Sequence, residues 1–274
     1  MLSKKSKIYV AGHNGMVGSA IIRELNNKKF KNVHTRSRKQ LNLLDQYKTF
    51  KFLNELKPDV VIICAAKVGG INANNLYRAE FIYENNQIQN NLIHGSYISK
   101  VKKLIFLGSS CIYPKNCKQP MKEEYLLSGK LEYSNEPYAI SKINGIKMCE
   151  NYNLQFKTNY ISLMPCNLYG QNDNYNLENS HFLPALISKI HDAKIYKKKH
   201  IELWGNGKAK REIMHVDDLA SACIYFLNKK IKHNLINIGS NKEYSIKEYA
   251  NMLMEEIGYK AKIRYNNEMP NGTP

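Results

Sequence analysis

Tyr138 and Lys142 are the residues whose spacing most directly suggests chemistry. They are four positions apart, so a helix would place both side chains on one face. An ammonium beside a phenol stabilises the phenolate and lowers the tyrosine pKa, so the phenol can exchange a proton with a carbonyl or carbinol oxygen. Upstream, Ser109 follows a hydrophobic run and could orient the same oxygen. These residues predict a site for proton transfer to an oxygen.

A glycine-rich turn near the start of the chain predicts a second kind of site. Three glycines spaced as G-x-x-G-x-x-G follow a β-rich run and precede a helical pattern. Glycines let the backbone approach a pyrophosphate, and the N-terminus of the following helix offers free N–H groups. We therefore expect a dinucleotide coenzyme, whose nicotinamide ribose Lys142 could also reach; a glycine turn without a ligand is the alternative. The expected contacts in the turn are Gly12, His13, Asn14, Gly15, Met16, Val17 and Gly18.

The next polar segment indicates which dinucleotide is bound. Arg36 and Arg38 follow the second expected strand, where sites that prefer NAD usually have an acidic residue. Guanidinium groups suit a 2′-phosphate, so we expect NADP(H); a solvated basic turn is the alternative. Asp45, the first acid downstream, could cap the next helix or contact the adenine, and the sequence leaves both open.

Short hydrophobic runs alternate with amphipathic stretches around these residues. We expect strands at residues 7–11, 32–36, 59–65, 103–108, 160–164 and 235–238, and helices at 16–26, 45–56, 78–100, 138–152, 215–227 and 245–257. Such alternation predicts an α/β fold, with a Rossmann-type parallel sheet, helices on both faces and right-handed crossovers. The segment from 169 to 211 is rich in Asn, Lys and Tyr and breaks this rhythm, which indicates a smaller C-terminal lobe.

The position of each motif suggests a division of the chain into two functional units. We expect residues 1–170, with about 215–245, to form the coenzyme-binding domain. Residues 171–214 and 246–274 would form the substrate-binding lobe.

Composition argues against several other classes of protein. The net charge is +18, which would suit nucleic-acid binding, but the lysines are dispersed and no arginine-aromatic pattern occurs, so we interpret the charge as a solvated surface. The six cysteines form no CxxC or CxxH pair, so we expect reduced thiols and no metal site. No hydrophobic run approaches the roughly 20 residues that span a bilayer. We expect a cytoplasmic protein without a nucleic-acid or membrane partner.

Seven blocks of sequence, in order along the chain, are similar to one family of enzymes. The blocks are residues 8–18, 64–75, 106–114, 136–142, 164–170, 180–185 and 211–218. They resemble the GDP-L-fucose synthases, which are extended short-chain dehydrogenase/reductases. The resemblance implies NADPH-dependent 3,5-epimerisation and 4-reduction of GDP-4-keto-6-deoxy-D-mannose to GDP-L-fucose. It also implies a homodimer, in which the helices near 78–100 and 138–152 pair with those of a second copy.

The resemblance assigns the residues that would handle protons. Protons beside a ketone are acidified, so inverting C3 and C5 needs one group to remove a proton and another to return it on the opposite face. Cys111 and His181 lie where the family has this pair, and a thiol and an imidazole can both titrate near neutrality. A packed thiol and a structural histidine are the alternatives. Ser109 would polarise the C4 oxygen, and Tyr138, supported by Lys142, would protonate it.

The resemblance also assigns binding residues. The nicotinamide side would be lined by Pro165, Cys166, Asn167, Leu168 and His181. Substrate contacts would come from Asn167, Lys189, Trp204, Arg211 and Asn271. Trp204, the single tryptophan, could equally be a packing anchor. Related dehydratases have an Asp-Glu pair after the strand-end serine or threonine; this chain has Ser110 and Cys111, which disfavours dehydration.

Three departures from the family pattern limit the resemblance. Asn14 replaces a frequent arginine, which leaves 2′-phosphate recognition to Arg36 and Arg38. Asn271 replaces an aspartate that contacts substrate, so this contact is in doubt. The chain stops where relatives continue for some tens of residues, so we expect a truncated sequence. The alternatives are another nucleotide-sugar 4-epimerase or reductase with the same Ser109, Tyr138 and Lys142, or a non-catalytic NADP- or RNA-binding protein.

Overall fold

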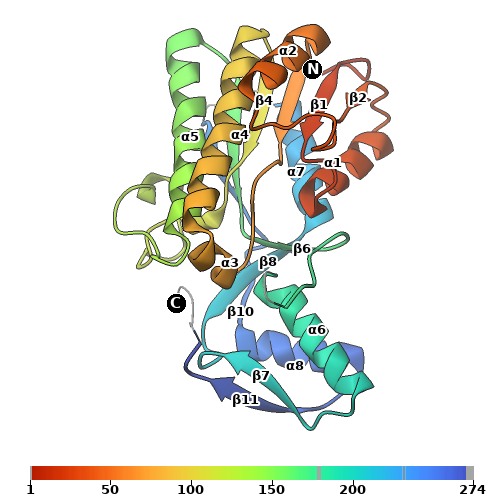
Figure 1. Cartoon of the computed structure of the whole chain (residues 1–274), viewed down its shortest axis with the longest axis vertical. Helices are drawn as coiled ribbons and strands as arrows, with labels where there is room; N and C mark the ends of the chain where they lie inside the picture. The colour runs from red at the N-terminus through yellow and green to blue at the C-terminus, as the bar shows by residue number, and fades with distance from the viewer. Residues whose placement is uncertain (1, 178–179, 230, 232, 270–274) are drawn as a thin grey trace.

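The computed structural model describes residues 2–177, 180–229, 231 and 233–269, which form two lobes of unequal size (Figure 1). The larger lobe contains a six-stranded sheet whose strands are all parallel. Its order is β2 (Val33–His34), β1 (Ile8–Ala11), β3 (Val60–Ile63), β4 (Lys103–Leu107), β5 (Tyr160–Pro165) and β9 (Leu235–Ile238). The strand order reverses direction between β1 and β3, and ligands of such sheets bind at the carboxyl ends near this point.

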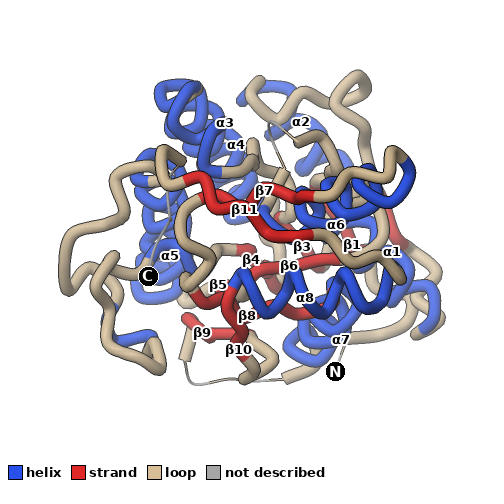
Figure 2. The backbone as a smooth tube through the Cα atoms, turned by 90° about the horizontal axis from the view of Figure 1, so that it is seen from below, coloured by secondary structure: helices blue, strands red, loops and turns tan. Residues whose placement is uncertain are grey.

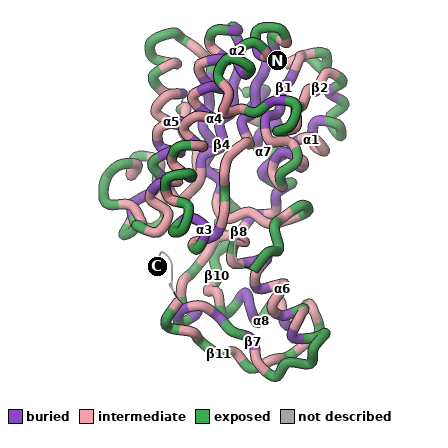
Figure 3. Tube along the Cα trace, in the orientation of Figure 1, coloured by how far each residue is buried: buried purple, intermediate pink, exposed green. Residues whose placement is uncertain are grey.

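Helices cover both faces of this sheet, as the alternating pattern predicts. The helices α1 (Met16–Asn27) and α7 (Val216–Leu227) pack together against one face. The helices α2 (Gln46–Leu56), α4 (Arg78–Ile98) and α5 (Glu136–Phe156) cover the other face (Figure 1). Buried residues are concentrated in the strands between these two layers (Figure 3). The predicted α/β fold class is confirmed.

Local signals explain where several helices begin. Asp45 is the N-cap of α2 and accepts a hydrogen bond from the backbone N–H of Lys48 at 3.0 Å, so its role as a cap is confirmed. Ser245 begins α8 (Ile246–Ile257) with a reciprocal capping box that includes Glu248. The short helix α3 (Ile71–Leu76) was not predicted, because its six residues show no hydrophobic period.

The smaller lobe has its own hydrophobic cluster. This cluster lies between α6 (Phe182–Ile195), α8 and a parallel pair of strands, β7 (His200–Trp204) and β11 (Lys262–Asn266). Figure 2 shows the paired strands with both helices nearby. A second sheet joins the lobes and contains β10 (Glu243–Ser245), β8 (Lys210–His215) and β6 (Asn167–Tyr169) (Figure 1). The division into coenzyme and substrate domains stays a prediction.

Two further expectations concern membrane-spanning helices and metal sites. None of the described helices is both long and apolar enough to cross a membrane. In the same part of the chain, no group of three or more His, Cys, Asp or Glu side chains could hold a metal ion.

A buried lysine links the sheet to the end of α7. Lys103, at the start of β4, is 5% exposed. Its Nζ donates hydrogen bonds to the carbonyls of Phe226 at 2.6 Å, Leu227 at 3.0 Å and Lys229 at 2.7 Å. Carbonyls at a helix C-terminus lack partners within the helix, so this ammonium satisfies them and fixes α7 against β4.

We expect Lys103→Met to lower the free energy of unfolding by about 2–3 kcal/mol, because it leaves buried carbonyls without their charged donor. Chemical denaturation measures this loss. The matched control is Lys102→Met, since Lys102 is 78% exposed and its ion pair with Asp59 is worth at most about 1 kcal/mol. Equal losses for the two variants would contradict the role of Lys103.

Candidate active site

The carboxyl ends of β3 and β4 and the first turns of α5 bring together the predicted proton-transfer residues. Lys142 is 4% exposed, and its Nζ donates a hydrogen bond to the carbonyl of Leu107 at 2.8 Å. The same Nζ lies 5.6 Å from the centre of the Tyr138 ring, so the predicted proximity of this pair is observed. Ser109 Oγ accepts a hydrogen bond from the backbone N–H of Cys111 at 3.4 Å. Four of the five predicted catalytic residues therefore form one cluster.

Burial decides the protonation of this cluster. It lowers the pKa of Lys142 to about 8, an effect opposed by Cys111 and Cys64. It raises the pKa of the Cys111 thiol, although the Ser109 hydrogen bond and Lys142 act in the opposite direction. The pKa of Tyr138 rises far above its ordinary value, first through burial and then through Cys111. The predicted lowering of the Tyr138 pKa and the near-neutral titration of Cys111 are contradicted by these directions, because desolvation is the largest influence on both groups.

The glycine turn leaves an open cradle at the start of α1. Gly12 has a φ of 86°, and a Cβ there or at Gly18 would lie under 3.0 Å from backbone atoms, so the fold itself requires both glycines. A Cβ at Gly15 would meet the carbonyl of Gly12 at 3.6 Å, an ordinary contact. Gly15 is the exposed N-cap of α1 and has no side-chain cap. The first N–H groups of α1 are thus open to a ligand, which fits a pyrophosphate.

The remaining coenzyme residues lie along the same edge of the sheet. Arg36 lies 5.1 Å from the centre of the Phe52 ring, and Arg38 pairs with Glu84 at 3.7 Å; both guanidinium groups are exposed. His13 is half-buried and Asn14 is exposed, whereas Met16 and Val17 are half-buried in the first turn of α1. No contact in the described structure tests recognition of a 2′-phosphate, which stays a prediction.

The segment after β5 connects the two lobes. Pro165 ends β5, and the Cys166 N–H donates a hydrogen bond to the carbonyl of Ile238 at 2.9 Å. Asn167 and Leu168 then enter β6, where Asn167 Nδ2 donates to the carbonyl of Glu212 at 3.2 Å. Because β5 and β4 are parallel neighbours, this segment and Ser109 leave the same edge of the sheet.

His181 lies at the N-cap of α6, outside the buried cluster. Its side chain is exposed, yet desolvation lowers the pKa of the imidazole, and the nearby Asp173 carboxylate raises it. In the described part of the chain, no hydrogen bond or ring contact joins His181 to Cys111 or Tyr138, so their pairing stays a prediction.

The predicted substrate residues that follow Asn167 in the described part of the chain lie in the smaller lobe and in the sheet that joins the two lobes. Lys189 Nζ lies 5.4 Å from the centre of the half-buried Trp204 ring and donates a hydrogen bond to the carbonyl of Glu202 at 3.1 Å. Arg211 lies on β8, where desolvation lowers its pKa and Tyr249 Oη donates to its carbonyl at 2.8 Å. Asn271 lies outside the described residues.

The sequence analysis missed three neighbours of the cluster. Cys64 follows β3 and interacts electrostatically with Lys142. The Phe81 ring meets Tyr138 edge to face, with centres 6.3 Å apart. Asp173 interacts with His181. Only Cys64 had a signal, because it follows the run DVVII at the expected carboxyl end of a strand.

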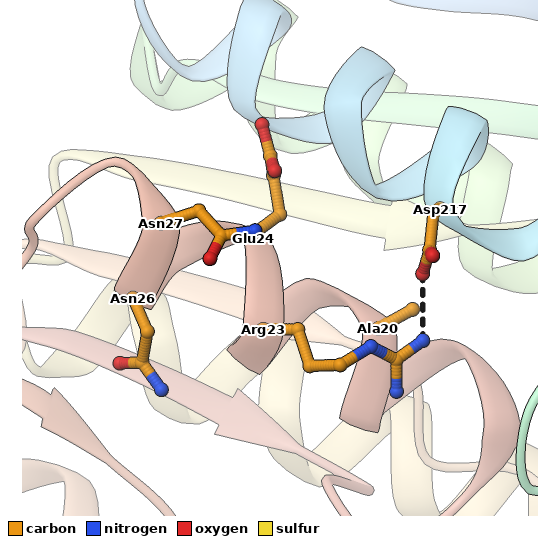
Figure 4. Close-up of a pocket in the computed structure, with 6 residues that line it drawn as sticks. All are labelled: Ala20, Arg23, Glu24, Asn26, Asn27 and Asp217. Carbon is orange, nitrogen blue, oxygen red and sulfur yellow. Dashed lines mark hydrogen bonds and ion pairs between the residues drawn. The ribbon is translucent and has the colours of Figure 1, made fainter.

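A surface hollow of about 390 Å³ lies elsewhere, between α1 and α7 (Figure 4). Arg23 and Asp217 form an ion pair across it at 2.6 Å. Its lining contains none of the predicted site residues, and Glu24, Asn26 and Asn27 complete a polar rim. The candidate active site therefore stays at the cluster of Ser109, Cys111, Tyr138 and Lys142.

Comparison with known proteins identifies the family of the chain. The NAD dependent epimerase/dehydratase family matches residues 8–239. The putative GDP-L-fucose synthase 2 of Arabidopsis thaliana is 51% identical over 274 residues, which cover 100% of this chain and 84% of that protein. The GDP-L-fucose synthase of Escherichia coli (strain K12) is 45% identical over 279 residues, which cover 98% of this chain and 87% of that protein.

A solved structure of a similar protein has the same fold. The GDP-mannoheptose C4 reductase from Campylobacter jejuni, with NADP bound, is 42% identical and has a TM-score of 0.88. The match covers 97% of this chain and 88% of that one. The resemblance drawn from the sequence is confirmed: this chain belongs to the NAD dependent epimerase/dehydratase family, among the extended short-chain dehydrogenase/reductases that include the GDP-L-fucose synthases.

Proposed function

We propose that this chain uses NADPH to convert GDP-4-keto-6-deoxy-D-mannose to GDP-L-fucose, by inverting C3 and C5 and then reducing C4. The observation that supports this most strongly is the cluster of half-buried Ser109, Cys111 and Tyr138 with buried Lys142, beside the open start of α1. A chain with these groups can exchange a proton beside a carbonyl and protonate the oxygen that reduction produces. The relatives named GDP-L-fucose synthase favour this substrate.

Each step of the proposed reaction depends on different residues of the chain. Cys111 and His181 exchange the protons at C3 and C5 on opposite faces of the sugar. NADPH, when bound, supplies the hydride for C4. Tyr138, kept protonated by its buried setting, donates a proton to the C4 oxygen, and Ser109 orients that oxygen. Lys142, whose pKa of about 8 leaves it mostly protonated at neutral pH, supports the phenol electrostatically.

Binding residues surround this centre. The first turn of α1, from Gly12 to Gly18, holds the pyrophosphate, and Arg36 and Arg38 hold the 2′-phosphate. Pro165 to Leu168 and His181 line the nicotinamide. The substrate contacts are Asn167, Lys189, Trp204, Arg211 and Asn271.

The assembly that we propose is a cytoplasmic homodimer formed through α4 and α5. These helices expose Tyr83 (65%), Ile140 (41%) and Leu154 (63%), which a second copy could cover. The high positive charge is assigned to the solvated surface.

A second candidate is a C4 reductase that acts on another GDP-sugar without epimerisation. The Campylobacter jejuni reductase, a GDP-mannoheptose C4 reductase, favours this alternative because it is 42% identical to the chain. Such an enzyme would need Ser109, Tyr138 and Lys142 but no thiol at position 111.

Substitution of Cys111 distinguishes these two candidate functions. We expect Cys111→Ser to lower GDP-L-fucose formation at least about 100-fold, because a hydroxyl is a far poorer proton-transfer group than a thiol. NADPH oxidation with the product identified by NMR measures this, and fluorescence titration should show NADPH affinity unchanged within about twofold. Cys117→Ser, a matched change at a half-buried free cysteine, is the control. Unchanged activity of Cys111→Ser would favour the C4 reductase.

The glycine cradle allows a test of coenzyme binding without catalysis. Gly15→Ala should change the free energy of unfolding by less than about 1 kcal/mol, because its Cβ fits the protein and only the cap is altered. It should weaken NADPH binding at least about tenfold, because the methyl group would block close approach of the pyrophosphate. Fluorescence titration and thermal unfolding measure the two effects. NADPH affinity equal to wild type would show that the coenzyme does not bind at this turn.

The pKa of Lys142 predicts a pH dependence. Burial lowers this pKa to about 8, so the ammonium is present below that pH and lost above it. We therefore expect kcat/KM to fall as the pH rises through about 8. In Lys142→Arg the cation stays protonated, so a weaker activity should persist to higher pH. An alkaline limb at the same pH in both proteins would assign it to another group.

A further inference from the structure

Side-chain amides of α4 hold three neighbouring segments, one of which carries Tyr138 and Lys142. Asn85, Gln89 and Asn91 are at most 2% exposed, and each donates a hydrogen bond to a backbone carbonyl outside α4. Asn85 Nδ2 binds the carbonyl of Lys67, in the loop after β3, at 3.0 Å, and Asn91 Nδ2 binds that of Leu43, before α2, at 2.8 Å. Buried amides are costly to leave unpaired, so each bond strongly favours one position of its segment.

The third amide, that of Gln89, reaches α5. Gln89 Nε2 donates a hydrogen bond to the carbonyl of Ser141, which lies between Tyr138 and Lys142 in the sequence. Ser141 Oγ in turn donates to the carbonyl of Tyr138 at 2.7 Å. The amide therefore acts on the turn of α5 that presents both the phenol and the ammonium.

Other hydrogen bonds also join α4 and α5, such as those from Asn144 Nδ2 to Asn86 Oδ1 and Asn90 Oδ1, whereas the Gln89 amide bonds the backbone of the turn between Tyr138 and Lys142. A Cβ at Gly145 would lie under 3.0 Å from the Phe106 ring and from Gln89 Oε1, so α5 approaches β4 and α4 through a position with no side chain. A smooth contact of this kind resists separation but resists sliding and rotation much less. The Gln89 hydrogen bond contributes resistance to sliding and rotation at the turn that carries Tyr138 and Lys142.

We propose that Gln89 is a positioning residue, whose amide sets the rotation of α5 so that Tyr138 and Lys142 meet Ser109 and Cys111. The expected loss of activity rests on the proposed function, whereas the positioning of α5 by Gln89 does not. Gln89 itself touches neither coenzyme nor substrate in this account. An error of about 1 Å in placing such groups can cost on the order of 100-fold in rate.

The direct test is Gln89→Met, which keeps the length of the side chain but removes the donor. We expect kcat to fall at least about tenfold, while KM and the NADPH dissociation constant change less than about threefold, because binding contacts remain and only the reacting groups move. Gln89→Asn keeps the amide but cannot reach Ser141, so it should also lower kcat with little change in KM. This variant replaces Gln89→Met if that protein does not fold.

A second readout does not depend on the substrate. Alkylation of Cys111 by iodoacetamide, followed at different pH values by peptide mass spectrometry, reports the pKa of its thiol. Cys111 faces Ser109, Tyr138 and Lys142; burial raises the pKa of its thiol, and the Ser109 hydrogen bond and the Lys142 ammonium lower it. Displacing α5 alters these influences, so the midpoint for Cys111 should shift from its wild-type value. The midpoint for Cys117, outside the cluster, should stay unchanged.

The control is Asn91→Leu, which removes a buried amide that binds a different segment. It should lower stability while leaving kcat and the Cys111 midpoint as in wild type. The inference is overturned if both Gln89 variants match wild type in kcat and midpoint, or if Asn91→Leu shows the same kinetic loss. If wild type turns over no GDP-keto sugar while the midpoint moves only in the Gln89 variants, the proposed function fails and the positioning role stands.

Discussion

The removal of Lys142 from water is the constraint on which the rest of the site depends. An ammonium that loses its hydration needs another partner, and the carbonyl of Leu107 at the end of β4 supplies one at 2.8 Å. The same burial lowers the pKa of Lys142 to about 8 and raises those of Tyr138 and Cys111. Desolvation of one cluster thus keeps the phenol and the thiol protonated at neutral pH, while the lysine remains mostly charged. That combination suits a site that must deliver protons to carbon and to oxygen.

Close packing maintains this exclusion of water. The helix α5 lies so near β4 that Gly145 has no space for a Cβ beside Phe106, and the buried amide of Gln89 on α4 bonds α5 from the other side. The second lobe joins the site through β6 and β8, where Asn167 binds the carbonyl of Glu212 and Tyr249 binds that of Arg211. Each predicted substrate residue of β6 and β8 is therefore held by backbone contacts between the lobes.

The sequence predicted the parts of the molecule that depend on local patterns. The parallel strands follow hydrophobic runs, as DVVII shows for β3, and the Tyr138–Lys142 pair follows from helical spacing. The pKa directions did not follow, because spacing reveals neighbours but not the desolvation that outweighs them. The small lobe was only outlined, since α6 and the short strands β7 and β11 have weak periodicity. Gln89 looked like an ordinary polar residue, because only the packing of α4 against α5 shows where its amide points.

The stereochemistry of the product tests the central claim most directly. Wild-type protein would be incubated with GDP-4-keto-6-deoxy-D-mannose and NADPH in deuterated water, and the product examined by NMR. The account predicts GDP-L-fucose with deuterium at C3 and C5, because protons are exchanged there, and with unlabelled hydride at C4. A reduced GDP-6-deoxyhexose that keeps the D configuration and has no deuterium at C3 or C5 would contradict it.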